Sequence, residues 1–135
     1  MPDLETGLRG EKEIVVGEQD LASFMGNVNA KVLATPRLIS LLEEAARSST
    51  ESRLPEGSMT VGTLIRVRHL AATPPGVKVR AKATLKEVDG RRLVFDVVAY
   101  DDFERIAEGE HERFVVSIEK FLERVNRKTE SDDGS

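Results

Sequence analysis

The sequence predicts an α+β domain in which one antiparallel sheet wraps around a single long helix. A strongly apolar helical pattern occupies residues 36–46. Beyond residue 57 the apolar positions recur with the period of two that is typical of strands. No second long helix lies between those strands to serve as a crossover connection, so a doubly wound parallel sheet is excluded.

Length and composition fit one globular domain. The chain has 135 residues, of which 39% are hydrophobic and 33% are charged. Such a chain buries about two-thirds of its unfolded surface in a single core. We expect residues 1–10 to form a flexible leader, 11–128 the folded domain and 129–135 a disordered tail, because both ends are polar.

Charge and residue usage exclude several classes of function. The 20 Lys and Arg residues are outnumbered by 24 Asp and Glu residues, and a net charge of −4 argues against nucleic-acid binding. The absence of cysteine excludes disulfides, thiolate zinc sites and a cysteine nucleophile. The longest uncharged run, Leu21–Ala30, is too short to cross a membrane, and the start lacks the apolar core of a secretory signal. We therefore expect a cytoplasmic protein without membrane or nucleic-acid partners.

A short strand at Glu13–Val16 is expected to open the fold, followed by a short amphipathic helix. Leu21, Phe24, Met25 and Val28 stand at i, i+3, i+4 and i+7, which is the spacing of one helix face. A glycine inside this segment disfavours the helix.

The long helix is predicted to begin at Thr35, whose hydroxyl is a natural N-cap, with Pro36 at the first helical position. A helix whose apolar residues cover most of its circumference is buried on more than one side. Those residues are Leu38, Ile39, Leu41, Leu42, Ala45 and Ala46. The helix is expected to end within Ser48–Thr50.

Four antiparallel strands are expected after the helix, arranged as a meander. The second of them alternates apolar and polar residues almost without error, as a strand with one solvated face does. Asp89 and Gly90 predict a tight hairpin between the second and third strands. The strands cover residues 58–70, 77–88, 92–101 and a segment that begins at residue 110.

A short helix that carries Phe121, Leu122 and Val125 is expected to close the domain. An antiparallel sheet around one nearly all-apolar helix is the hot-dog architecture. It leaves an edge strand and an apolar flank exposed, and pairing two copies covers both. We therefore expect a homodimer, with a tetramer as the larger alternative.

Standard catalytic signatures are absent. No glycine spacing matches a nucleotide-binding loop, and there is no Gly-x-Ser-x-Gly elbow. The two histidines lie 42 positions apart, at 69 and 111, and no cysteine accompanies them. These features argue against a metal site.

Three polar residues, Thr35, Glu43 and His69, are candidates for chemistry. His69 ends a strand ahead of a Pro-Pro-Gly turn, and an imidazole titrates near neutrality. Glu43 stands among the apolar residues of the long helix. Each also has a plainer interpretation: Thr35 as an N-cap, Glu43 with Glu44 on a narrow solvent-facing side, and His69 on a strand surface. The residues alone leave these alternatives open.

Four strings form a recognisable pattern in the second half of the chain. They are His-x-Ala-Ala-Thr-Pro-Pro-Gly at 69–76, Glu-Val-Asp-Gly-Arg-Arg-Leu at 87–93, Gly-x-His-Glu-Arg at 109–113 and Glu-Lys-Phe at 119–121. With these strings the chain resembles the fluoroacetyl-CoA thioesterase branch of the hot-dog superfamily. The resemblance runs from about Glu13 to Lys128 and is strongest after Gly57.

The resemblance implies an enzyme that hydrolyses a small acyl-CoA thioester to the free acid and CoA. It carries the family's threonine, glutamate and histidine onto Thr35, Glu43 and His69. The family's glycine near the thioester carbonyl corresponds to Gly62, and the arginine of its His-Glu-Arg string to Arg113, which would organise the site or contact a phosphate. His69 would activate Thr35 or water, and Glu43 would act as base or nucleophile. No cofactor is implied, because CoA is part of the substrate.

The chain departs from the family pattern upstream of the helix. Gly26 and Asn29 stand where the family's lid phenylalanines are expected, and Phe24 contacts the substrate only if the segment shifts. The resemblance therefore implies thioesterase chemistry without implying fluoroacetyl selectivity.

Two other functions are compatible with the same fold. One is a non-catalytic acyl-CoA-binding dimer that serves as a sensor or carrier, although such a module has little need of a Thr–Glu–His set. The other is hydration of an enoyl-CoA. A cationic stripe on the second long strand either contacts the CoA phosphates or forms a solvated sheet face, and the second interpretation is the commoner one. The stripe comprises Lys78, Arg80, Lys82 and Lys86.

Overall fold

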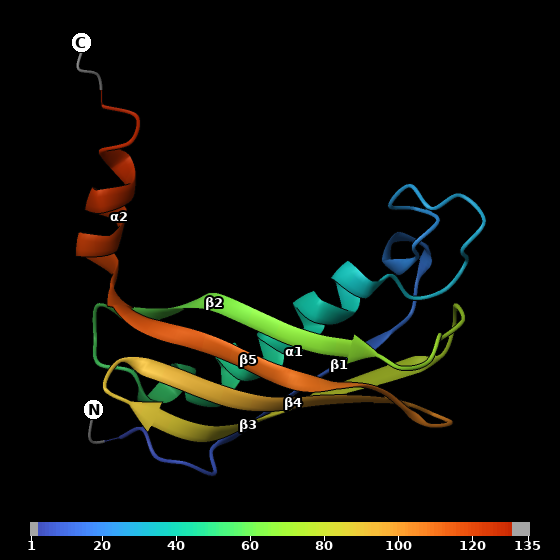
Figure 1. Cartoon of the computed structure of the whole chain (residues 1–135), viewed down its shortest axis with the longest axis horizontal. Helices are drawn as coiled ribbons and strands as arrows, with labels where there is room; N and C mark the ends of the chain where they lie inside the picture. The colour runs from blue at the N-terminus through green and yellow to red at the C-terminus, as the bar shows by residue number, and fades with distance from the viewer. Residues whose placement is uncertain (1–2, 131–135) are drawn as a thin grey trace.

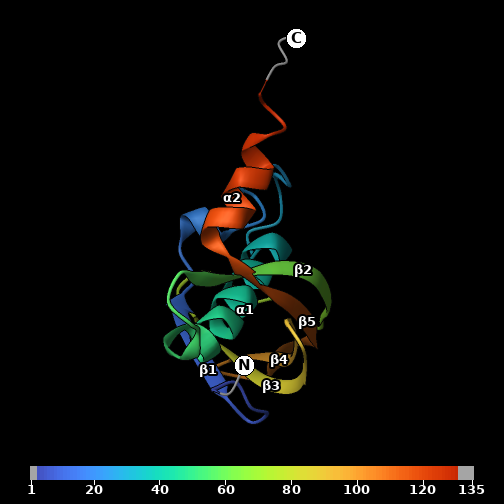
Figure 2. The same cartoon turned by 90° about the vertical axis from the view of Figure 1, so that its left-hand side faces the viewer.

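The computed structural model describes residues 3–130 and consists of one curled five-stranded sheet with a long helix packed against it (Figure 1). The strands are β1 (Arg9–Val15), β2 (Ser58–His69), β3 (Lys78–Asp89), β4 (Arg92–Asp101) and β5 (Arg105–Ser117). The helices are α1 (Thr35–Thr50) and α2 (Ile118–Asn126), with 3₁₀ turns at Glu18–Asp20 and Glu51–Arg53. Seen end-on, the sheet curves around α1 from β2 through β5, β4 and β3 to β1 (Figure 2). The predicted α+β class is confirmed.

The core lies between α1 and the inner face of the sheet. Leu38 and Leu42 of α1 are fully buried there. On β3, the inward alternation of Val79, Ala81 and Leu85 is as predicted. Full burial of one leucine side chain stabilises the fold by about 1.5–3 kcal/mol, so this layer fixes α1 against the strands.

The expected four-strand meander is wrong for β2. The strand order is β1-β3-β4-β5-β2, and β2 pairs with β5 instead of β3. The meander does hold for β3, β4 and β5, with Gly90 at φ +61° in the predicted hairpin. Residues 70–77 join β2 to β3. Eight residues reach about 26 Å, further than three strand spacings of about 4.8 Å, so consecutive strands need not be neighbours here.

No α-helix forms at 21–28, contrary to the prediction. Gly26 has a φ of +110°, which interrupts any helix in this segment. Leu21 is buried and pairs in an isolated bridge with Leu33, whereas Phe24 and Val28 are exposed. Three of the four residues at helical spacing therefore lie on the outer side of a loop, and only Leu21 packs inward.

The predicted domain boundary at residue 11 is wrong. Leu4 is buried, the N–H of Gly7 donates to the carbonyl of Leu85, and β1 already begins at Arg9. Gly10 lies so close to α1 that an added Cβ would overlap a backbone carbonyl oxygen of the helix. This contact needs a residue without a side chain, so an apolar pattern does not reveal it.

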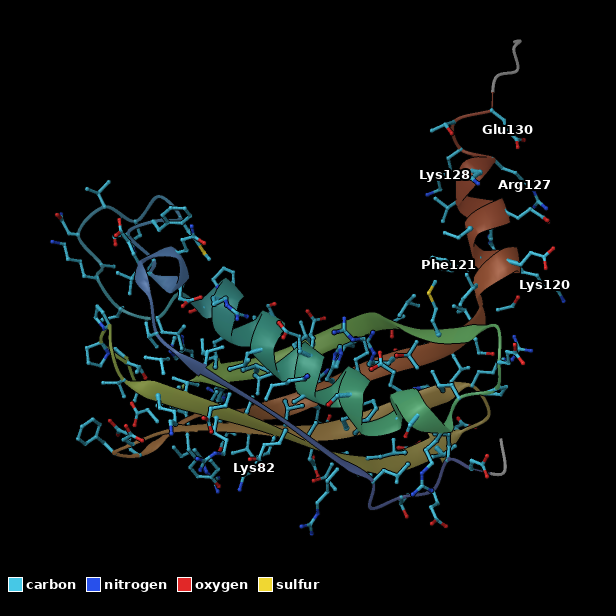
Figure 3. All side chains as sticks on the ribbon, turned by 180° about the vertical axis from the view of Figure 1, so that it is seen from behind. Lys82, Lys120, Phe121, Arg127, Lys128 and Glu130 are labelled. Carbon is cyan, nitrogen blue, oxygen red and sulfur yellow. The ribbon has the colours of Figure 1, made fainter. Side chains whose placement is uncertain are left out.

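The C-terminal helix forms as predicted but does not close the domain. α2 begins after Ser117, whose hydroxyl accepts a hydrogen bond from the N–H of Lys120. It stands away from the sheet at the end of β5, and none of its residues is buried (Figure 3). Of the predicted tail, residues 131–135 lie outside the described residues. Within residues 3–130, no helix is both long and apolar enough to cross a membrane.

Candidate active site

Thr35 and His69 meet at the N-terminal end of α1. The distance from Thr35 Oγ1 to His69 Nδ1 is 2.8 Å. Ala34 is the N-cap residue, and no side chain caps the helix. The prediction of Thr35 as an N-cap is therefore wrong, because its hydroxyl bonds to the last residue of β2. The positive end of the helix dipole lies at the same place.

His69 is suited to accept a proton. Burial lowers its pKa from the ordinary value of 6.5, and the nearby backbone of Ala71 opposes this shift only in part. The neutral ring that results at pH 7 can accept the Thr35 proton at Nδ1 and then carries its own hydrogen on Nε2. That Nε2 is buried without a hydrogen-bond partner among residues 3–130. Its hydrogen-bonding capacity is therefore unused among these residues.

A cavity of about 340 Å³ opens beside the Thr35–His69 pair. The loop before α1 and the residues after β2 line it, mainly with small side chains such as Ala22, Ala30 and Ala71. Its volume lies in the usual range of ligand pockets, about 300–1,000 Å³. Phe24 does not line this cavity and is 60% exposed.

Glu43 belongs to a second polar cluster, further along α1. Its Oε2 atom is 3.9 Å from Nε2 of His111. A Cβ added at Gly62 would lie 3.1 Å from the same Oε2 atom and 3.3 Å from Nη1 of Arg113. The Glu43 side chain is 39% exposed, so the burial expected from its apolar neighbours is incomplete within one chain.

Arg113 is buried and held by three hydrogen bonds. Its Nε donates to the hydroxyl of Thr60 at 2.8 Å and its Nη2 to the carbonyl of Thr60 at 2.9 Å. Nη1 donates to Nε2 of His111 at 3.1 Å. Burial lowers the pKa of Arg113 and Glu43 opposes this shift, but a guanidinium remains charged near neutrality. These hydrogen bonds hold the guanidinium in one orientation.

One chain does not bring the predicted catalytic set together. Eight residues of helix separate Thr35 from Glu43 by about 12 Å along the axis. Gly62, which touches Glu43, and His69, which touches Thr35, lie about 23 Å apart on the same strand. The Thr35–His69 pair, at the end of β2, and the Glu43 cluster, beside Gly62 in its interior, are therefore two separate half-sites.

Residues 16–119 match the family model described as fluoroacetyl-CoA-specific thioesterase, FlK. The chain belongs to this family. It is 42% identical over 99 residues to the fluoroacetyl-CoA thioesterase of Streptantibioticus cattleyicolor, which covers 73% of this chain and 71% of that protein.

Solved structures agree with this family. A Thr-to-Ser variant of FlK in complex with acetyl-CoA superposes with a TM-score of 0.88 at 34% identity, covering 94% of this chain and 100% of that one. A hot-dog-like protein from Thermanaerovibrio acidaminovorans also gives 0.88, at 25% identity, covering 96% of each chain. The hot-dog fold and the thioesterase resemblance are confirmed, and this FlK-family chain is a thioester hydrolase. The roles of Thr35, Glu43 and His69 stay predictions.

Sequence reasoning misses His111 as a member of the Glu43 cluster. This side chain is 1% exposed and lies on β5, two residues before Arg113. Alternate residues of a strand face the same side, so an inward Arg113 requires an inward His111. That alternation is the signal that could have found it.

The cationic stripe on β3 of this FlK-family chain is paired with its neighbours. Lys78 and Arg80 lie 3.5 and 3.2 Å from carboxylate oxygens of Glu13. Lys82, labelled in Figure 3 on the outside of the sheet, lies 5.8 Å from the centre of the Tyr100 ring. The fourth cation of the stripe also pairs with carboxylates. These contacts favour a solvated sheet face over a phosphate site.

Gly62→Ala is expected to lower thioesterase kcat by about tenfold, because small displacements of catalytic groups have large effects on rate. The new methyl group would lie 3.1 Å from Glu43 Oε2, which must give way by a few tenths of an ångström. Steady-state kinetics and the thermal midpoint, Tm, measure the two effects. Gly17→Ala, where the nearest atom is 3.5 Å away, is the matched control. A folded Gly62→Ala variant with the wild-type kcat would contradict the importance of this contact.

Proposed function

We propose that this chain hydrolyses CoA thioesters of small acyl groups to the free acid and CoA. The observation that carries the proposal is the 2.8 Å contact between Thr35 and His69, beside a cavity at the positive end of α1. Family membership supports the same reaction. CoA enters as part of the substrate, so the reaction needs no further cofactor, and its expected place is the cytoplasm.

In the proposed mechanism, His69 moves the proton. Neutral His69 takes a proton from Thr35, or from a water held beside it, as that oxygen bonds to the thioester carbonyl carbon. The positive end of α1 stabilises the oxyanion, together with a backbone N–H of the partner subunit's Gly62 in the paired arrangement proposed below. When the C–S bond breaks, the electron pair leaves with sulfur and His69 returns the proton to the thiolate. Attack by Thr35 gives an acyl-enzyme that water then hydrolyses, whereas attack by water gives the acid directly.

We further propose that Glu43 reaches the Thr35–His69 pair from a second copy of the chain. The two half-sites of one chain lie too far apart for direct contact. The Nε2 atom of His69 lacks a partner among the described residues, and a carboxylate is a suitable acceptor for its hydrogen.

Strand β2 offers a route to this arrangement. It is the last strand of the sheet, so one of its edges has no strand beside it within residues 3–130. Antiparallel pairing with the partner's β2, centred between Ile65 and Arg66, sets the partner subunit's Gly62 opposite His69. The partner subunit's Glu43 then faces the imidazole of His69.

The protein is expected to be a dimer at micromolar concentration. The reason is that both the unpaired edge of β2 and the shared site require a second copy. Sedimentation or light scattering should give twice the chain mass of 14.9 kDa. A monomer with full activity would contradict the shared site, whereas a tetramer built from such dimers agrees with it.

Thiol release tests the proposed function directly. Acetyl-, fluoroacetyl- and butyryl-CoA are offered, and free CoA is measured with a thiol reagent. We expect catalytic release matched by free acid, and activity not confined to fluoroacetyl-CoA, because Phe24 is exposed and small residues line the cavity. Binding without release would replace this proposal by an acyl-CoA-binding module. Loss of enoyl-CoA absorbance without thiol release would replace it by hydration.

A further inference from the structure

His111 is a buried titratable residue to which the proposed mechanism assigns no task. It lies on β5, faces α1 and is 1% exposed. Its ring contacts three elements: the carbonyl of Leu64 on β2, Glu43 on α1, and the ring of Phe95 on β4. Burial of a polar ring is costly unless its nitrogens are hydrogen-bonded, and both of them are.

The hydrogen bonds of His111 define its tautomer. Nδ1 lies 2.8 Å from the carbonyl oxygen of Leu64, which can only accept, so Nδ1 carries the hydrogen. Nε2 lies 3.1 Å from Nη1 of Arg113, which can only donate, so Nε2 is the acceptor. Only the neutral ring satisfies both bonds. In agreement, burial lowers the pKa of His111, and the charge of Arg113 lowers it further, while the hydrogen bond to Leu64 and two nearby carboxylates oppose this shift only in part.

A β-bulge delivers the Leu64 carbonyl to His111. The register between β2 and β5 shifts between Gly62 and Leu64, next to the glycine that touches Glu43. Bulges commonly re-aim groups beside active sites. Here the bulge sets the acceptor that orients the imidazole.

The oriented imidazole fixes Arg113 in turn. The hydroxyl and the carbonyl of Thr60 accept hydrogen bonds from Nε and Nη2 of the guanidinium. Nε2 of His111 accepts one from Nη1. Gly62 lies beside both groups. A Cβ added to it would be 3.3 Å from Nη1 of Arg113 and 3.1 Å from Oε2 of Glu43. The guanidinium, the carboxylate and the ring edge of His111 are therefore gathered around the backbone of Gly62.

We propose that His111 is a positioning residue that, as the neutral Nδ1–H tautomer, holds the charged guanidinium of Arg113 in place near Glu43 and so orders this half-site for thioester hydrolysis. The inference rests on the proposed function for its catalytic consequence. His111 itself touches neither the Thr35–His69 pair nor the cavity beside it. Its effect passes through Arg113.

Two substitutions of His111 distinguish a role in positioning Arg113 from a role in packing alone. His111→Leu keeps an apolar volume but offers no acceptor, and it is expected to lower kcat by about 10–100-fold with KM changed by less than about threefold. His111→Gln supplies a carbonyl that can accept from Arg113 and an NH₂ that can donate to Leu64. The kcat of the His111→Gln variant is expected to be at least tenfold higher than that of the His111→Leu variant. Equal kcat for the Leu variant and the wild type, or equal losses for Leu and Gln at the same Tm, would overturn the proposal.

Nitrogen-15 NMR of the wild-type protein tests the tautomer without requiring that any variant folds. The chain has two histidines, so a His69→Ala spectrum assigns both rings. We expect a protonated Nδ1 and an unprotonated Nε2 for His111 at pH 7, and a hydrogen on Nε2 would overturn the proposal. The proposed function has its own test and fails if the wild-type protein releases no thiol from any acyl-CoA. The NMR result on the His111 tautomer does not depend on that outcome.

Discussion

Glu43→Gln is expected to lower kcat for acetyl-CoA hydrolysis by about 100-fold or more, the usual scale for general acid–base catalysis. The amide keeps the size of the carboxylate but carries no negative charge to stabilise His69 while that ring holds the proton. Because the side chain is 39% exposed, the exchange should leave Tm close to that of the wild type. Steady-state kinetics with thiol detection and a thermal melt measure the two quantities.

Glu44→Gln is the matched control for this experiment. Glu44 is the next residue of α1, and its carboxylate contacts Arg37 at 3.4 Å and Ser40 at 3.3 Å. The charge change is identical, but we place Glu44 in neither half-site. Its kcat should remain within about twofold of wild type, as for an ordinary surface substitution. Equal rates for wild type and Glu43→Gln would contradict the proposed role of Glu43 beside His69.

His69→Ala is expected to lower kcat by about 100-fold or more as well, because it removes the group that accepts and returns the proton. Thr35→Ala should produce a loss of similar size if Thr35 is the nucleophile. The double variant should then be no slower than the worse single variant, since groups that act as a unit give non-additive effects. If the loss of kcat in the double variant equals the product of the two single losses, Thr35 and His69 act independently.

The pH dependence of kcat/KM gives a second view of His69. Only the neutral ring can accept a proton, and burial lowers the pKa of His69 below 6.5. The value of kcat/KM should therefore be constant just above pH 6.5 and should fall as the pH drops through the lowered pKa of His69. The same shift makes the folded state bind fewer protons than the unfolded chain, so stability also declines as the pH falls from 6.5. An acid limb centred above 6.5 would contradict a neutral His69.

Much of the fold follows from apolar periodicity, because burial on one face sets which residues point inward. Val79, Ala81 and Leu85 on β3 are an example. The apolar pattern does not show which strands pair with each other in the sheet, so it does not place β2 beside β5. Nor does it detect Gly10, whose contact with α1 depends on a missing side chain.

The site was predictable in part for a similar reason. Spacing on α1 places Thr35 and Glu43 about 12 Å apart along the helix. Spacing does not say which subunit's Glu43 meets which subunit's His69, because that depends on how two copies pair. The Thr35–His69 contact itself joins residues 34 positions apart, and only the family resemblance suggested it.

A subunit-mixing experiment tests the shared site most directly. Glu43→Gln and His69→Ala dimers, each nearly inactive, are mixed under conditions where mass spectrometry confirms subunit exchange. If each site takes His69 from one chain and Glu43 from the other, every mixed dimer holds one intact site. About one quarter of wild-type activity should then return, since half of the dimers are mixed and half of their sites are whole. Complete exchange without recovered activity would contradict the account.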